Sequence, residues 1–132
     1  MAVAVALLPG RYAICRLPPD APAPALTGDF VSITRTAAEL SVIAPEDRSP
    51  EGAVRSGGWR LLRLEGPFDL SLTGILAPLA TALAAAGVSL LPVGTYDTDY
   101  LLVRETQLDA ALAALAGAGC TVTPADPSSP AG

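Results

Sequence analysis

The sequence predicts an α+β fold built from two ferredoxin-like halves, the first of them abbreviated. Residues 59–124 follow the order strand, helix, strand, strand, helix, strand. This is the order of the ferredoxin-like βαββαβ motif, an antiparallel sheet with both helices on one face. Residues 1–45 follow a shorter order of strands around one short helical segment. Residues 46–58 are polar, rich in Gly and Pro and without periodicity, which is typical of a linker.

Two apolar segments begin the first half. Val3–Leu8 and Arg11–Leu17 are predicted strands, and the turn dipeptide Pro9-Gly10 between them would allow them to form a hairpin. The prolines of residues 18–24 then predict an extended loop.

Residues 30–44 are expected to form a strand, a helix and a second strand. Phe30–Thr34 and Ser41–Ala44 are short segments with the composition of β-strands. Thr36 and Glu39 have the spacing of a capping box, which predicts a very short helix between the two strands.

The second half contains longer periodic segments. Two of them have apolar residues at helical spacing and are followed by glycine, which commonly ends a helix. A proline inside a helix removes a backbone hydrogen bond, so Pro78 leaves two alternatives for the first helix. Either its regular part begins near Ala77, or its first turn is distorted. Pro92 favours an edge position or a bulge for its strand. The predicted strands are Trp59–Leu64, Val88–Val93, Tyr100–Val103 and Cys120–Thr123, the predicted helices are Leu72–Ala86 and Glu105–Ala116, and residues 125–132 are expected to be a disordered tail.

Charge and composition disfavour several classes of protein. The formal net charge is −5 and the eight basic residues are scattered, which disfavours binding to nucleic acid or to an anionic membrane. The apolar N-terminal run lacks a basic flank and is too short to span a bilayer, so a cytoplasmic location is expected. The chain has no histidine, and Cys15 and Cys120 lie far apart. We therefore expect reduced cysteines, no metal site and no cofactor.

Two turns of the second half concentrate the polar chemistry of the chain. In the first turn, Ser71 or Thr73 can cap the following helix, or the free N–H groups there can bind a carboxylate. In the second turn, Asp97 and Asp99 are compatible with a weak metal site, with binding of an ammonium group, or with Asx-turn chemistry. The polar and small residues of the two turns are Asp69, Ser71, Thr73 and Gly74, and Thr95, Tyr96, Asp97, Thr98 and Asp99.

Three segments resemble a known family. The sequences FVSITRTAAELSV, GPFDLSLTGIL and GTYDTDYLLV occur in this order. In this respect the chain, over about residues 8–122, resembles small bacterial ACT-domain proteins related to the CASTOR arginine sensors of animals. The resemblance implies tandem ACT-type halves, with an amino acid bound at the interface between them.

The resemblance also implies which residues bind the ligand. Backbone N–H groups near Val42 and near Gly74 and Ile75 would hold the α-carboxylate, and Asp99 would pair with a cation on the ligand. One departure disfavours arginine and favours a smaller or more apolar amino acid: the arginine sensors have an acidic residue where this chain has Leu72. The implied ligand-binding residues are Ser41, Val42, Asp69, Gly74, Ile75, Leu76, Thr95, Tyr96, Asp97, Thr98 and Asp99.

These observations leave three hypotheses about function. The first is a non-catalytic regulatory protein that binds an amino acid, forms a homodimer as ACT-type modules usually do, and reports to an unidentified protein partner. The second is a protein-interaction module whose pocket is vestigial, as the apolar Leu72 would suggest. The third is a small enzyme of amino-acid metabolism, disfavoured because the sequence offers no pair of nucleophile and base and no phosphate-binding loop.

Overall fold

The computed structural model describes residues 3–65 and 76–124, which divide into two compact units. Residues 10–59 form the smaller unit, and residues 3–9 group with the chain from Arg60 onward in the larger unit. Strand β5 (Val54–Leu64) contributes its first residues to the smaller unit and its remaining residues to the larger one.

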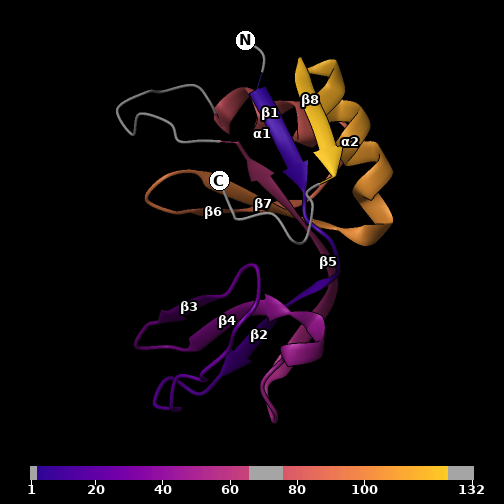
Figure 1. Cartoon of the computed structure of the whole chain (residues 1–132). Coiled ribbons are helices and arrows are strands. Elements are labelled where there is room, and N and C mark those ends of the chain that lie inside the picture. The colour runs from indigo at the N-terminus through magenta and orange to yellow at the C-terminus, as the bar shows by residue number, and fades with distance from the viewer. Residues whose placement is uncertain (1–2, 66–75, 125–132) are drawn as a thin grey trace. The chain divides into compact units, whose positions relative to one another are not determined.

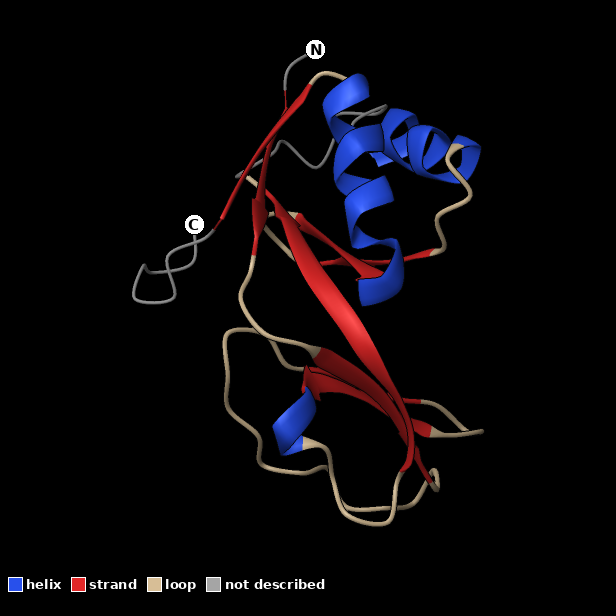
Figure 2. Cartoon of the chain, turned by 90° about the vertical axis from the view of Figure 1, so that its right-hand side faces the viewer, coloured by secondary structure: helices blue, strands red, loops and turns tan. Residues whose placement is uncertain are grey.

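The larger unit is a mixed sheet with two α-helices on one face (Figures 1 and 2). Its strands follow the order β6-β7-β5-β1-β8. Strand β1 is antiparallel to β5 and parallel to β8, so it lies between them. The elements besides β5 are β1 (Val3–Leu7), α1 (Leu76–Ala85), β6 (Leu90–Gly94), β7 (Asp99–Arg104), the 3-10 helix η2 (Glu105–Gln107), α2 (Leu108–Gly117) and β8 (Cys120–Pro124).

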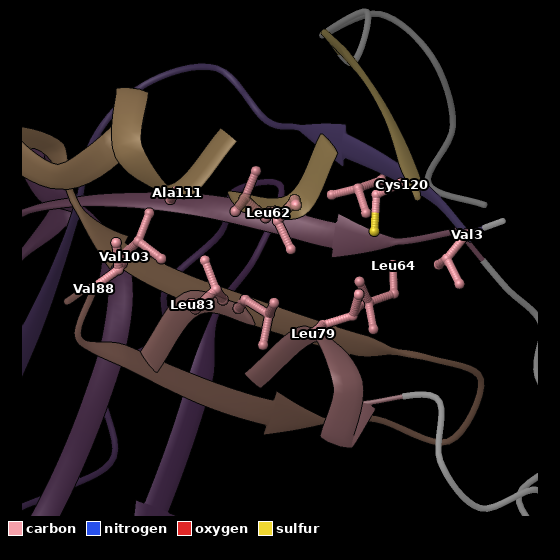
Figure 3. Packing of buried hydrophobic residues seen from close by; sticks show 12 residues of the cluster. Val3, Leu62, Leu64, Leu79, Leu83, Val88, Val103, Ala111 and Cys120 are labelled. Atoms are coloured by element: carbon pink, nitrogen blue, oxygen red, sulfur yellow. The ribbon is translucent and has the colours of Figure 1, made fainter. Parts of the chain in front are cut away.

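The core of the larger unit explains why the helices lie together. Leu79 and Leu83 of α1 and Leu115 of α2 are buried against alternate residues of the strands, such as Leu62 (Figure 3). Side chains two apart on a strand point to the same face, so each strand presents its apolar set to the helices. Val5 of β1 is fully buried in this cluster.

The smaller unit is an antiparallel sheet in the order β3-β4-β2-β5. It contains no α-helix in residues 10–59, all of which are described. Its elements besides β5 are β2 (Tyr12–Leu17), β3 (Ser32–Arg35), β4 (Leu40–Pro45) and the 3-10 helix η1 (Glu46–Arg48). One face of the sheet holds a second apolar cluster of Ala13, Cys15, Leu40, Val42 and Ala44.

The predicted fold class is confirmed: the chain is an α+β protein with a ferredoxin-type sheet and two helices. The sheet of the larger unit is mixed rather than antiparallel, because β1 is inserted between β5 and β8. The predicted hairpin of residues 3–8 and 11–17 is wrong for the same reason. β1 pairs with β5 and β8, whereas β2 pairs with β4 and β5.

The predicted short helix at residues 36–39 is also wrong. The N–H of Thr36 donates to the Glu39 carbonyl at 2.9 Å, which closes the turn between β3 and β4. The Thr36 hydroxyl oxygen accepts from the N–H groups of Ala38 at 3.1 Å and Glu39 at 3.2 Å. A threonine can make these bonds in a turn as well as at a helix start, so the capping-box spacing did not separate the two.

Several other elements differ from the sequence prediction in their extent. Residues 46–58, expected to be a linker, include η1 and the first part of β5. Pro78 is the third residue of α1 as described, and the residues before Leu76 lie outside the described residues, so neither alternative for the start of this helix is tested. Pro92 lies in β6, which pairs only with β7 among the described strands, so the predicted edge position is confirmed. The expected tail lies outside the described residues.

The buried position of β1 gives a prediction about stability. Val5→Ala should lower the free energy of unfolding by about 2 kcal/mol, because two buried methyl groups are lost and a cavity remains. Urea denaturation of the full chain measures this loss. The control Ala4→Ser lies at an exposed position of the same strand and should change stability by less than about 0.5 kcal/mol. Equal effects of the two substitutions would contradict the insertion of β1 into the sheet.

Candidate functional site

The second polar turn of the sequence joins β6 to β7 and is tightly hydrogen-bonded (Figure 1). Gly94 and Asp99 are the last pair of the ladder. The N–H of Thr95 donates to the Thr98 carbonyl at 2.8 Å, and the Thr95 hydroxyl donates to the same oxygen at 3.0 Å. The Thr98 N–H donates in return to the Thr95 hydroxyl oxygen at 3.3 Å. These bonds hold the turn in one conformation.

Thr98 also fastens this turn to the central strand. Its hydroxyl donates to the carbonyl of Leu64, near the end of β5. Thr98 was predicted as a site residue, but its partner could not be predicted, since a carbonyl on a distant strand leaves no pattern in the sequence. The turn is therefore connected to β5 by a side chain in addition to the backbone pairing of β7 with β5.

The Asp99 carboxylate lies against Gly94 on the facing strand. A Cβ atom built on Gly94 would be 3.3 Å from the Asp99 Oδ1 atom, so the absence of a side chain at Gly94 leaves room for this carboxylate. Asp99 is half-buried, whereas Tyr96 at the tip of the turn is 85% exposed. Gly94 was not among the predicted site residues, although a glycine directly before a polar turn is visible in the sequence.

The structure distributes the other predicted site residues over both units. Leu76 begins α1 as described and is packed against the core of the larger unit. Ser41 and Val42 belong to β4 in the smaller unit. Val42 is fully buried and is paired on both sides, with Cys15 of β2 and Ile33 of β3. Asp69, Gly74 and Ile75 lie outside the described residues.

The β6–β7 turn brings several polar side chains together. It offers the carboxylates of Asp97 and Asp99 and the hydroxyl groups of two threonines and a tyrosine. Within residues 3–65 and 76–124, no group of three or more Cys, Asp or Glu residues could hold a metal ion. No helix among the same residues is long and apolar enough to cross a membrane.

Comparison with known proteins identifies the fold and the family. A family model of the ACT domain matches residues 54–117, and a model of an N-terminal domain matches residues 10–52. The X-ray structure of protein Atu0741 from Agobacterium tumefaciens is 35% identical in sequence, with a TM-score of 0.88 over 96% of each chain. No curated protein sequence matches the chain.

Two further solved structures share the fold at lower identity. A Vibrio cholerae protein described as a possible transport protein is 23% identical, with a TM-score of 0.70 over 89% of this chain and 90% of that one. The regulatory subunit of aspartate kinase from Thermus thermophilus is 16% identical, with a TM-score of 0.62 over 86% of this chain and 96% of that one.

Residues 54–117 therefore match an ACT domain. The chain as a whole belongs to the same family as the Agobacterium protein.

The contact between the turn and β5 predicts the effect of Thr98→Val. This substitution keeps the shape of the side chain but removes the hydroxyl that donates to Leu64. The free energy of unfolding in urea should fall by about 1 kcal/mol, the usual net value of one hydrogen bond. The control Thr121→Val lies on an exposed position of β8 and should have a smaller effect. Unchanged stability of Thr98→Val would show that this hydroxyl does not fasten the turn.

Proposed function

We propose that this protein is a regulatory protein without catalytic activity that binds a free amino acid at the β6–β7 turn. The ACT domain at residues 54–117 supports a regulatory role. The fold is also that of the regulatory subunit of an aspartate kinase.

The observation that supports this proposal most directly is the position of the Asp99 carboxylate. It is half-buried, lies against Gly94 and follows a turn that is held by its own hydrogen bonds. A carboxylate in such a position can pair with the α-ammonium group of an amino acid without first being ordered. Charge-assisted hydrogen bonds of this kind are about twice as strong as neutral ones.

The complete form of the proposal follows the resemblance to the arginine sensors. In it, Asp69, Gly74, Ile75 and Leu76 contribute near the start of α1, and Ser41 and Val42 contribute from the first half, so that the ligand lies at the interface between the two ACT-type halves. Leu72 replaces an acidic residue of those sensors. A guanidinium would then lack a partner, so the proposal favours a smaller or more apolar amino acid.

Regulation requires that the ligand bind two states of the protein with different affinities. We propose that the two states differ in the assembly of a homodimer or in the affinity for a regulated protein partner. A ligand that binds both states equally would change neither equilibrium. Size-exclusion chromatography with and without the bound amino acid tests the first of these alternatives.

A thermal-shift screen of the full chain against the twenty amino acids tests the proposed function. A ligand present at about 100 times its dissociation constant stabilises the protein by about 2.7 kcal/mol. For a chain of this size the midpoint should then rise by several degrees. One amino acid or a small group of similar ones should give this shift. A screen without any shift would contradict the proposal and favour a protein-interaction module with a vestigial pocket.

Asp99→Asn tests the role of the carboxylate once the ligand is known. The substitution keeps the size of the side chain and removes its charge, so calorimetry should show affinity reduced by roughly 30-fold to 1000-fold. Asp109→Asn is the matched control: Asp109 is an exposed acidic residue in the first turn of α2, and its removal should leave affinity within about twofold of the parent. An unchanged affinity for Asp99→Asn would remove this residue from the site.

A further inference from the structure

The Glu46 carboxylate of the smaller unit contacts one backbone N–H and two arginine side chains near an irregular point of β5. Glu46 Oε2 accepts from the N–H of Gly58 at 2.7 Å. Glu46 Oε1 lies 3.4 Å from Arg55 Nη2 and 3.8 Å from Arg11 Nε. The Glu46 side chain is 23% exposed, so these contacts are partly shielded from water. The carboxylate therefore connects η1 with β5 and with the residue before β2.

The irregular point is a β-bulge between β5 and β2. Trp59 lies opposite Tyr12, but Ser56 lies opposite Ile14. Two residues of β5, Gly57 and Gly58, therefore face the single residue of β2 that lies between Tyr12 and Ile14. Gly58 has a φ of +76°, a conformation that glycine adopts easily. At Gly57, a Cβ atom would be 2.7 Å from Glu46 Oε2. Gly58 thus suits the backbone of the bulge, and a side chain at Gly57 would displace the carboxylate that lies on it.

The residues of β5 before the bulge have an alternative register on β2. Without the extra residue, each of them would move by one position along β2 and turn to the opposite face of the sheet. Ser56 would then lie opposite Cys15, where Arg55 lies now, and Val54 would lie opposite Leu17. Val54 is 62% exposed in the observed register, whereas Leu17 packs against the apolar cluster of the smaller unit. The alternative register would therefore bury an apolar side chain that is now in water.

Electrostatics favours the observed register. Arg55 lies opposite Cys15 and beside the Glu46 carboxylate. In the alternative register Arg55 would lie directly opposite Arg16, and like charges that face each other across strands are destabilising. The N–H of Gly58 would lose its carboxylate partner as well. Burial of Val54 thus favours the alternative register of β5, whereas the contacts of Glu46 favour the observed register.

We infer that the N-terminal part of β5 is a two-register element and that the Glu46 carboxylate selects the observed register. Removing or displacing this carboxylate shifts residues 54–57 by one position along β2. The ladder of β5 beyond the bulge does not need to move, because the bulge absorbs the shift of one residue. This inference does not depend on the proposed ligand.

Cys15 reports the register directly, because its partner on β5 differs between the two registers. We would introduce Ser56→Cys into a chain with Cys120→Ala and oxidise the folded protein with diamide. With Glu46 present, the thiol introduced at position 56 and the Cys15 thiol point to opposite faces and should form little disulfide. With Glu46→Gln, the two thiols should become cross-strand partners, and disulfide formation should rise about tenfold or more, the change expected when a charge-assisted hydrogen bond is lost.

Two controls define the result. Arg55→Cys with Glu46 intact should form the disulfide with Cys15, which shows that the ladder allows a bond between directly opposite residues. Asp47→Asn removes the exposed neighbouring carboxylate of η1 and should leave Ser56→Cys unreactive. Gly57→Ala gives a second test, since its Cβ displaces the carboxylate without removing it.

Three outcomes would overturn the inference. One is a folded Glu46→Gln chain in which the thiol introduced by Ser56→Cys remains unreactive, while the thiol introduced by Arg55→Cys still reacts with Cys15. Another is a disulfide between Cys15 and the thiol at position 56 that forms in the presence of Glu46 at the same yield as in its absence. The third is the failure of both Glu46→Gln and Gly57→Ala to fold, because a strand with an accessible second register would retain a folded sheet.

Discussion

The fold depends on β5, a single strand that supplies backbone partners to both units. Its first residues pair with β2, and its remaining residues pair with β1 and β7. Backbone N–H and C=O groups that are buried must be paired, so the strands of each unit are arranged around their part of β5. The bulge at Gly57 and Gly58 lies within the pairing with β2, because Trp59 beyond it still pairs with Tyr12, and Glu46 accepts from the Gly58 N–H at the bulge.

The candidate site follows from the same strand. Strand β7 of the β6–β7 hairpin pairs with β5. The Thr98 hydroxyl in the turn of this hairpin donates to the carbonyl of Leu64 on β5. The position of Asp99 is therefore set by a strand in the middle of the sheet, and the absence of a side chain at Gly94 leaves space for its carboxylate. A binding group held in this way loses little conformational freedom when a ligand arrives, which favours affinity.

Local patterns in the sequence predicted the elements whose cause is local. Pro92 indicated an edge strand because proline cannot donate to a ladder, and Gly87, with a φ of +74°, ended the first helix as expected. The insertion of β1 beside β8 could not be predicted, since it joins residues more than a hundred positions apart. The capping-box spacing of Thr36 gave a wrong helix prediction, because a turn and a helix start use the same hydroxyl contacts. Of the candidate site, the turn residues were recognisable, but the partner of Thr98 and the space at Gly94 depend on tertiary structure.

The most direct measurement is a titration of the isotope-labelled full chain with the amino acids, followed through its backbone amide NMR signals. The account predicts that one amino acid shifts the signals of residues 95–99 and of Leu64 in a saturable way. Saturable binding of an amino acid that leaves the signals of residues 95–99 unchanged would contradict the proposed site. The absence of any saturable change with every amino acid would contradict the proposed function.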